Sequence, residues 1–404
     1  MIIVNPITNK SINDIQNYLE TSQLEIDTLK IFMDLQNISV GKYYPDNLLN
    51  YFNSVNEKDM ARIVQQEIIL LVHNKIKSFL DIGIKNIFVY LYTDENKNIV
   101  NEYFISSWKT DRGKVWESLH KHYKDQYDAS SWFSTIYDAS IKSLSYLCNT
   151  SRKCKIISLR YIDSDFVPNV FIELDKQANI YNHTLYLIVT NDHDYLHLTN
   201  YDHAIIYVPT EKEHKLLNKY NVYKRFEKKF PQKTLTVYDR QLIAKFYPIF
   251  HSLIGDPTDS IKPVIAKKGI IYWFKQLKDI LVDYDDYTSL RYDIITDKIN
   301  LVPDNIQQEF INRLYITDFY FFSLWLIYEI TNITNSNIKV DQAIIDKTYN
   351  SLPVNIKQIF KDNALYFLHS ILTKDVLSQT DASKILANVI QLYKDANEIV
   401  QNIW

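Results

Sequence analysis

Five short apolar runs constrain the fold of this chain more than any other feature of its sequence. They are LKIFMDL (29–35), NIFVYLY (86–92), KIISLRY (155–161), TLYLIVT (184–190) and AIIYVP (204–209). Nearly continuous apolar runs of this length are typical of strands buried on both faces of a parallel sheet. Between them, stretches such as residues 59–83 carry an apolar residue every three to four positions, which favours helices. The alternation predicts a three-layer α/β domain with a central, mainly parallel sheet.

The chain is long enough for more than one domain. With 404 residues, of which 46% are hydrophobic, it can bury a large core. After the last apolar run the pattern is helical only. We therefore expect an N-terminal extension (1–28), the α/β domain (29–235), a helical region (236–340) and a helical C-terminal region (341–404).

The sequence predicts neither secretion nor a contact with a membrane. The most apolar segment, FYFFSLWLIYEI (319–330), is well short of the roughly 20 residues needed to cross a bilayer, so it favours a buried core helix. The amino terminus lacks the basic and apolar regions of a signal peptide. The two cysteines, Cys148 and Cys154, lack a metal-ligand spacing. We expect a cytoplasmic protein with reduced thiols.

Aspartates stand where four of the predicted strands end. They are Asp34, Asp94, the pair Asp163 and Asp165, and the pair Asp192 and Asp194. The carboxyl ends of parallel strands meet at one edge of the sheet, where two carboxylates in contact repel by roughly 1 to 4 kcal/mol. Such a cluster indicates bound Mg²⁺ or Mn²⁺, and a pair of these ions is typical of phosphodiester cleavage. Each aspartate could instead be a helix N-cap or a turn residue.

A further acidic motif follows in the helical half, SLIGDPTDSIKPV (252–264), with Asp256 and Asp259. Alone it is ordinary turn chemistry. Placed after the acidic strand ends, it makes the series resemble the 5′-to-3′ exonuclease and flap endonuclease family, nearest in pattern to the ribonuclease H of T-even phages. The matching elements, in the family's order over residues 29–275, are DLQN, YTDEN, SSWKTDR, YIDSDF, TNDHDYLHL and IGDPTDSI.

The resemblance implies a PIN/FEN-like fold and a metal-dependent, structure-specific 5′-to-3′ nuclease that removes flaps or RNA primers in replication. It implies that Lys109 and Arg112 hold the scissile phosphate and stabilise its developing charge. It implies a two-metal site of Mg²⁺ or Mn²⁺, for which the candidate ligands are Asp34, Asp94, Asp163, Asp165, Asp192, Asp194, Asp256 and Asp259. The partners would be DNA with a 5′ flap or a nick, or an RNA–DNA hybrid, together with replication proteins. If a phage encodes the chain, its place would be the host-cell cytoplasm.

The same resemblance implies three nucleic-acid-binding elements. Trp108 would stack on a base beside the cut. Residues 113–150 would form an arch that tracks a single strand, although an amphipathic surface helix explains the same pattern. Residues 255–273 would form a helix-three-turn-helix element that holds the duplex backbone around a monovalent cation such as K⁺. The basic residues in these two segments are Lys114, Lys121 and Lys124, and Lys262, Lys267 and Lys268.

Several positions depart from the family's pattern. Phe166 stands where the family has the second Asp of its Glu-Ala-Asp-Asp element, and Asp163 replaces the Glu. The duplex-binding turn keeps few glycines, so that element is degenerate. These departures favour an alternative, a weak or inactive module that binds nucleic acid or forms a complex. A PIN-like ribonuclease would share the acidic core but does not explain IGDPTDSI.

Overall fold

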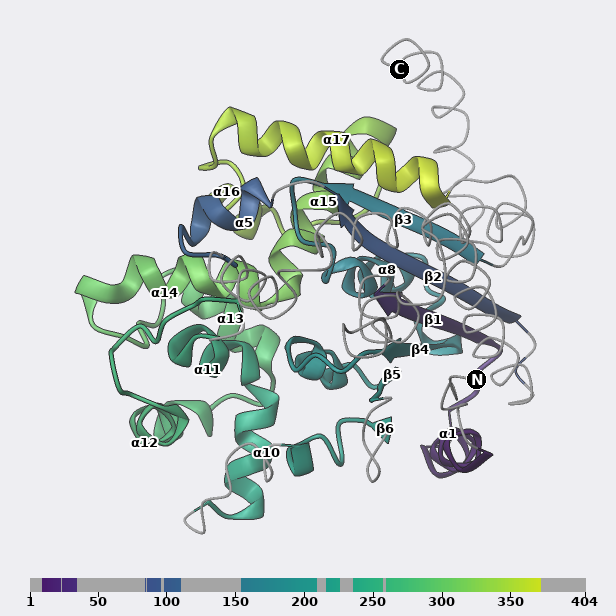
Figure 1. The fold of residues 1–404 in the computed structure, drawn as a ribbon, viewed down its shortest axis with the longest axis horizontal. Coiled ribbons are helices and arrows are strands. Elements are labelled where there is room, and N and C mark those ends of the chain that lie inside the picture. The colour runs from purple at the N-terminus through teal and green to yellow at the C-terminus, as the bar shows by residue number, and fades with distance from the viewer. Residues whose placement is uncertain are drawn as a thin grey trace, which may run out of the picture.

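A mainly parallel sheet forms the centre of the molecule (Figure 1). The computed structural model describes residues 9–22, 24–34, 84, 86–95, 98–109, 154–208, 216–225, 235–256 and 259–371. Within them the strand order is β3-β2-β1-β4-β5-β6, and only the β5–β6 pair is antiparallel. The strands are β1 (Thr28–Asp34), β2 (Asn86–Glu95), β3 (Cys154–Arg160), β4 (Thr184–Val189), β5 (Ala204–Tyr207) and β6 (Leu216–Leu217). The predicted α/β class is confirmed.

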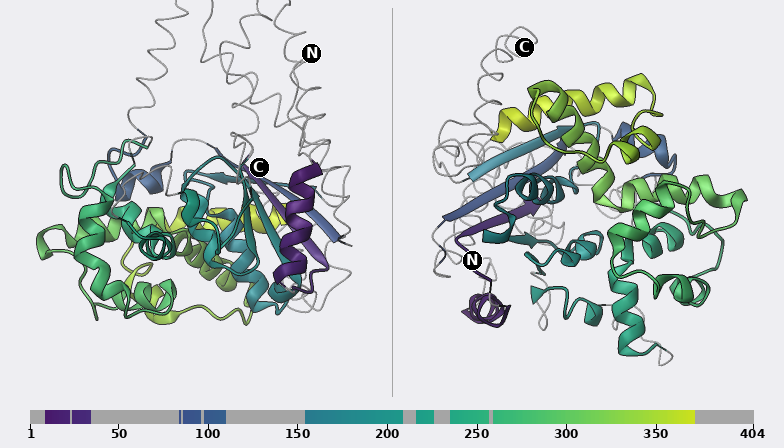
Figure 2. Two further views of the ribbon diagram at one scale, coloured as in Figure 1. Left: turned by 90° about the horizontal axis from the view of Figure 1, so that it is seen from below. Right: turned by 180° about the vertical axis from the view of Figure 1, so that it is seen from behind.

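The helices flank the sheet and continue beyond the carboxyl ends of its strands (Figures 1 and 2). Early in the chain are α1 (Asn9–Ser22), α5 (Ile99–Phe104), α8 (Val167–Gln177) and the 3₁₀ helices η1 (Tyr181–His183) and η2 (Asp194–Asn200). The helical half contains α10 (Val237–Lys245), α11 (Tyr247–Ile254), α12 (Ile270–Leu281), α13 (Tyr287–Ile295), α14 (Asp304–Thr317), α15 (Phe319–Thr334), α16 (Gln342–Lys347) and α17 (Val354–Ile371). The predicted helical region after the sheet is therefore present.

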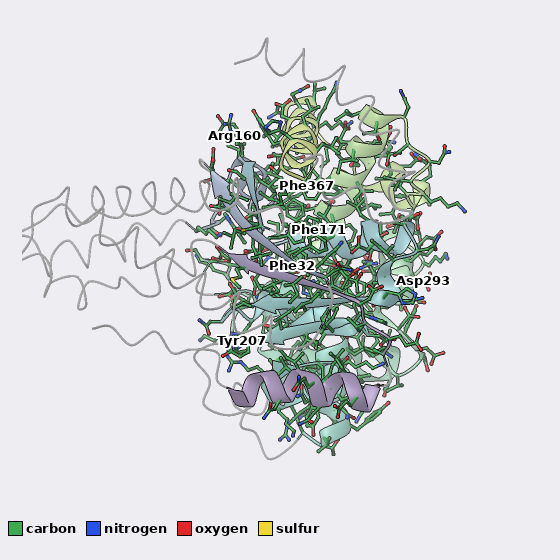
Figure 3. The ribbon with its side chains drawn as sticks, turned by 90° about the vertical axis from the view of Figure 1, so that its right-hand side faces the viewer. Phe32, Arg160, Phe171, Tyr207, Asp293 and Phe367 are labelled. Carbon is green, nitrogen blue, oxygen red and sulfur yellow. The ribbon has the colours of Figure 1, made fainter. Side chains whose placement is uncertain are left out.

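The apolar runs of the inner strands form β-strands whose side chains are buried on both faces. All six residues of β4 are buried, as are the five central residues of β1. Packed aromatic rings connect β1 through α8 to α17 (Figure 3). The ring centroids of Phe32 and Phe171 are 5.3 Å apart, and those of Phe171 and Phe367 are 5.4 Å apart. The apolar segment predicted as a core helix is α15, which is buried around most of its circumference. No helix in the described part of the chain is long and apolar enough to cross a bilayer.

An ion pair lies inside this core, between β1 and α8. Lys30 of β1 forms an ion pair with Asp175 of α8 at 2.5 Å, and the Tyr186 hydroxyl donates to the same carboxylate oxygen at 2.7 Å. These contacts satisfy the buried ammonium and tie α8 to two strands.

Cys154, the first residue of β3, is disulfide-bonded, so the expectation of reduced thiols is wrong for this residue.

Helix α17 covers the outer strand β3 through one buried side chain. The Arg160 backbone N–H donates to Asn363 Oδ1 at 2.7 Å, and Asn363 Nδ2 donates to the Arg160 carbonyl at 2.8 Å. The Arg160 guanidinium lies 4.6 Å from the centre of the Tyr366 ring. The Asn363 side-chain amide therefore pairs both the N–H and the carbonyl of Arg160, the last residue of β3.

Asn363→Ala is expected to lower the free energy of unfolding by about 2 kcal/mol, because it leaves buried backbone groups without partners. Urea denaturation of the parent and the variant measures the change. Asn305→Ala, at an exposed position of α14, is the control and should change stability by less than about 0.5 kcal/mol. Equal stability of parent and Asn363→Ala would contradict this role.

Candidate active site

The sheet register brings the acidic strand ends to one edge. Asp34, the last residue of β1, pairs with Tyr92 of β2, and Asp94 pairs with Leu159 near the end of β3. Asp163 and Asp165 follow in the turn before α8. Asp192 follows β4, and Asp194 begins η2. The edge therefore gathers aspartates from four neighbouring strands.

These carboxylates lie close enough to affect one another. Burial, and then the negative charges of Asp163 and Asp34, raise the pKa of Asp165 well above its ordinary value. The negative charge of Asp192 also raises the pKa of Asp165. Burial and the charge of Asp163 likewise raise the pKa of Asp94. Carboxylates that resist ionisation in this way gain from a nearby cation.

Lys109 supplies one such cation. Its ammonium forms an ion pair with Asp163 Oδ2. Burial opposes the charge on Asp163, but the charge and hydrogen bond of Lys109, together with hydrogen bonds from Asp165, hold the pKa of Asp163 below its ordinary value. The backbone of Lys109 has a positive φ of 54° and donates to the Asp259 carbonyl at 2.8 Å. The lysine is therefore placed by a contact with the IGDPTDSI motif.

Helix α5 orients Asp163 from the other side. Asn101 Oδ1 accepts from the Asp163 backbone N–H at 3.1 Å, and Asn98 Nδ2 donates to Asp163 Oδ2 at 3.5 Å. Asn98 precedes the first residue of α5. Neither asparagine was predicted as a site residue, because both lie outside the acidic motifs.

Two tyrosines orient Asp165. The Tyr195 hydroxyl donates to Asp165 Oδ1 at 2.5 Å, and the Tyr92 hydroxyl donates to the Tyr195 oxygen at 2.8 Å. Burial and the negative charge of Asp165 raise the pKa of Tyr195, so it stays a donor. Sequence reasoning missed both tyrosines because they continue apolar runs.

The two Asp-x-Asp motifs form the same kind of turn. Asp163 Oδ1 accepts from the Asp165 backbone N–H at 3.2 Å, and Asp192 Oδ1 accepts from the Asp194 backbone N–H at 3.0 Å. The turn role that an aspartate often takes after a strand is therefore present here. It uses one oxygen of the first aspartate and leaves its other oxygen for a second role.

A second group of ligand atoms lies where η2 meets the end of α11. His251 Nε2 lies 3.3 Å from Asp256 Oδ2, and His251 Nδ1 lies 3.7 Å from Asp194 Oδ1. One ligand atom from each residue lies within 4.8 Å of the others, and no other three acidic, histidine or cysteine residues in the described part of the chain meet this closely. Two oxygen donors and one imidazole form a donor set suited to a divalent transition metal.

The turn after α11 depends on Gly255. Its φ is 71°, and a Cβ there would meet the Ile261 carbonyl oxygen at 2.4 Å. Asp256 follows directly and its carbonyl accepts from the Ile261 backbone N–H at 2.8 Å. The glycine of the predicted motif therefore permits the turn that carries Asp256. Asp259 is buried and contacts Lys109 through its backbone, but its carboxylate does not join the group around His251.

His251 was not predicted as a site residue. In the sequence it looks like a single polar residue on an apolar helix, YPIFHSLI. The available signal was its position, four residues before the glycine of IGDPTDSI.

The predicted nucleic-acid contacts divide into three sets. Lys262 and Lys267 are exposed between α11 and α12, and the Lys268 ammonium lies 4.3 Å from the centre of the Tyr272 ring.

Trp108 is only 6% exposed, and its indole N–H has no hydrogen-bond partner among the described residues. A base cannot stack on a ring buried in this way, so the position of Trp108 does not fit its predicted role. The remaining predicted residues, Arg112, Lys114, Lys121, Lys124 and the arch at 113–150, lie outside the described residues.

Phe166 is buried in the core, and its side chain lines the same cavity as Asp163 and Asp165. It is 2% exposed and precedes the first residue of α8. Its ring meets that of Phe322 edge-on, with centroids 5.6 Å apart. The Phe166 ring therefore packs the start of α8 against α15.

The chain is similar to known proteins in its three-dimensional structure but not in its sequence. No protein-family model and no curated protein sequence matches the chain. The structure is similar to T5 5′-exonuclease with bound zinc (11% identity, TM-score 0.48, covering 84% of this chain and 99% of that one). It is similar to a T5 protein co-crystallised with metal ions (12% identity, TM-score 0.48, covering 82% of this chain and 99% of that one). It is also similar to a bacteriophage T5 flap endonuclease in a pseudo-enzyme–product complex with DNA and metal ions (11% identity, TM-score 0.45, covering 84% of this chain and 98% of that one). These are likenesses between very different sequences, and the residues above are assigned by their own geometry.

Proposed function

We propose that this chain is a metal-dependent, structure-specific 5′-to-3′ nuclease that cleaves the phosphodiesters of 5′ flaps or RNA primers in replication. The observation that carries the proposal is the edge of the sheet itself. Carboxylates from four strand ends gather there with Lys109, and Asp194, His251 and Asp256 bring ligand atoms within 4.8 Å. The order of the acidic motifs in the sequence supports the same activity.

The donor set fits divalent cations. Asp194, His251 and Asp256 would hold one ion, and the carboxylates around Asp165 would hold a second. A bound cation would lower the pKa of the attacking water and offset charge on the phosphate. The identity of the ion as Mn²⁺ or Mg²⁺ is part of the proposal.

The chain's own residues would position the substrate and the carboxylates. Lys109 would turn its ammonium from Asp163 towards the phosphate, where a fixed positive charge stabilises the transition state. Asn101 and Tyr195 hold Asp163 and Asp165 in place during that change. The exposed lysines between α11 and α12 would contact the duplex backbone, and the loop they occupy is the proposed place for a K⁺ ion. We propose DNA and replication proteins as partners, and the cytoplasm as the place of action.

A second candidate function rests on Phe166 and Trp108. Both are buried where the resemblance calls for a metal ligand and for a base-stacking ring. They favour a module that binds nucleic acid, or joins a complex, with little cleavage. Incubation of the purified chain with a labelled 5′-flap duplex and with an RNA–DNA hybrid, in Mn²⁺ or in EDTA, separates the two. Binding without Mn²⁺-dependent cleavage would favour the second.

Millimolar Mn²⁺ is expected to raise the melting temperature of the full chain, because an ion that binds only the folded state stabilises it. The gain is about 2.7 kcal/mol at one hundred times the dissociation constant. Thermal denaturation with Mn²⁺ and with EDTA measures the shift. The double variant Asp194→Asn, Asp256→Asn should lose the part of the shift that comes from the ion held by Asp194, His251 and Asp256. An unchanged melting temperature in the parent would argue against the metal site.

A further inference from the structure

A buried histidine is an unusual member of the acidic group between η2 and α11. His251 is 2% exposed, and its two ring nitrogens lie 3.3 Å from Asp256 Oδ2 and 3.7 Å from Asp194 Oδ1. A neutral imidazole carries a proton on only one nitrogen. The other nitrogen then directs a lone pair at a carboxylate oxygen. In a neutral ring, a cation bound between that nitrogen and the carboxylate oxygen would make their contact attractive.

The ring is held in this position. It stacks on Tyr247, one helical turn earlier in α11, with centroids 5.3 Å apart and planes at 8°. The Gly255 N–H donates to the His251 carbonyl at 3.0 Å, and Gly255 begins the turn that carries Asp256. The imidazole and one carboxylate are therefore fixed on the same short segment, which reduces the ordering needed when an ion binds.

We propose that His251 is a metal ligand that sets the selectivity of this site, so that it prefers Mn²⁺ and Co²⁺ to Mg²⁺. Mg²⁺ binds oxygen ligands in near-octahedral geometry and keeps several waters. Imidazole nitrogen suits transition metals, whose affinities rise from Mn²⁺ to Co²⁺. A site with two carboxylates and one imidazole therefore discriminates against Mg²⁺, whereas a site of carboxylates alone does not. This inference rests on the metal site of the proposed function, but not on cleavage.

Titration calorimetry of the full chain with Mg²⁺, Mn²⁺ and Co²⁺ separately tests the assignment. The variant His251→Gln removes the imidazole at similar size, and His251→Asp makes the site all-oxygen. In both, the ratio of Co²⁺ to Mg²⁺ affinity should fall by about tenfold or more, the scale of effect seen when metal-site contacts are lost. In His251→Asp, Mg²⁺ affinity should rise. The visible absorption spectrum of bound Co²⁺ should change in both variants.

His203→Gln is the matched control. His203 is also buried, but it lies just before β5, and its ring packs 4.8 Å from that of Tyr181. This variant should keep the parent's affinity ratio and Co²⁺ spectrum. Urea denaturation of each protein shows whether it is folded under the conditions of the titration.

Two results would overturn the assignment. One is the same affinity ratio in the parent and in folded His251→Gln. The other is tighter binding of all three ions when the imidazole is removed, which would make His251 a positive counter-ion that competes with metals. A parent that fails to cleave nucleic acid but shows the predicted selectivity would refute the nuclease proposal and leave this one standing.

Discussion

Lys109→Ala is expected to lower the turnover of flap cleavage by about 10²- to 10³-fold, the usual effect of removing a preorganised donor to the transition state. Lys109 is the charged group paired with Asp163 at the acidic edge. Its backbone N–H donates to the Asp259 carbonyl at 2.8 Å, which holds the residue beside the IGDPTDSI motif. Single-turnover cleavage at saturating Mn²⁺ measures the change.

Lys298→Ala is the control for the loss of one positive charge. Lys298 is exposed and pairs with Asp293, on α13. This variant should cut at the rate of the parent. Equal rates for Lys109→Ala and the parent would refute the proposed role of Lys109, and would favour the binding module if both rates were negligible.

The same variant has an expected pH dependence. Lys109 helps to hold the pKa of Asp163 below its ordinary value, and its charge offsets part of the rise in the pKa values of Asp94 and Asp165. A depressed carboxyl pKa contributes stability that is present above the unfolded value of about 4 and is lost as the pH falls through the folded value. Lys109→Ala should therefore be less stable than the parent near neutral pH. The difference in melting temperature should shrink in acid, as the carboxylates become protonated in both proteins.

The fold could be predicted from the sequence because its strands carry a strong local signal. A parallel strand buried on both faces is mostly apolar along its length, and the runs at β1, β2, β4 and β5 have this pattern. The order of the strands fixed where their carboxyl ends meet, so Asp34 and Asp165 could be expected near each other. β6 gave no such signal, since two residues are too short to show a period.

The contacts of individual polar residues could not be predicted in the same way. Lys30 interrupts an apolar run, and only the packing of α8 shows that Asp175 meets it. Trp108 lies among polar residues, SSWKTDR, which suggests exposure, yet the helical half covers it. His251 looks like a core residue until α11 places it beside Asp194, 57 positions earlier in the chain. Burial and long-range contact decide these roles, and neither has a local pattern.

Phe166→Asp is expected to lower the free energy of unfolding by about 5 kcal/mol, because it combines the loss of a core aromatic ring with an unpaired carboxylate. The position is 2% exposed against Phe322, and the new charge would also lie near Asp163 and Asp165. Phe166→Leu, which keeps an apolar side chain, should cost much less. Thermal and urea denaturation of the three proteins measure this.

Cleavage by the same proteins across a Mn²⁺ series shows what the missing carboxylate means. A parent that cleaves, and a Phe166→Asp variant that is destabilised without cutting faster at limiting Mn²⁺, would mean that the chain works with the ligands it has and uses Phe166 to join α8 to α15. Faster cleavage by a stable Phe166→Asp would contradict the core role assigned to the ring. If parent and variant were equally inert, the nuclease proposal would be refuted, and the binding module of the second candidate function would be favoured.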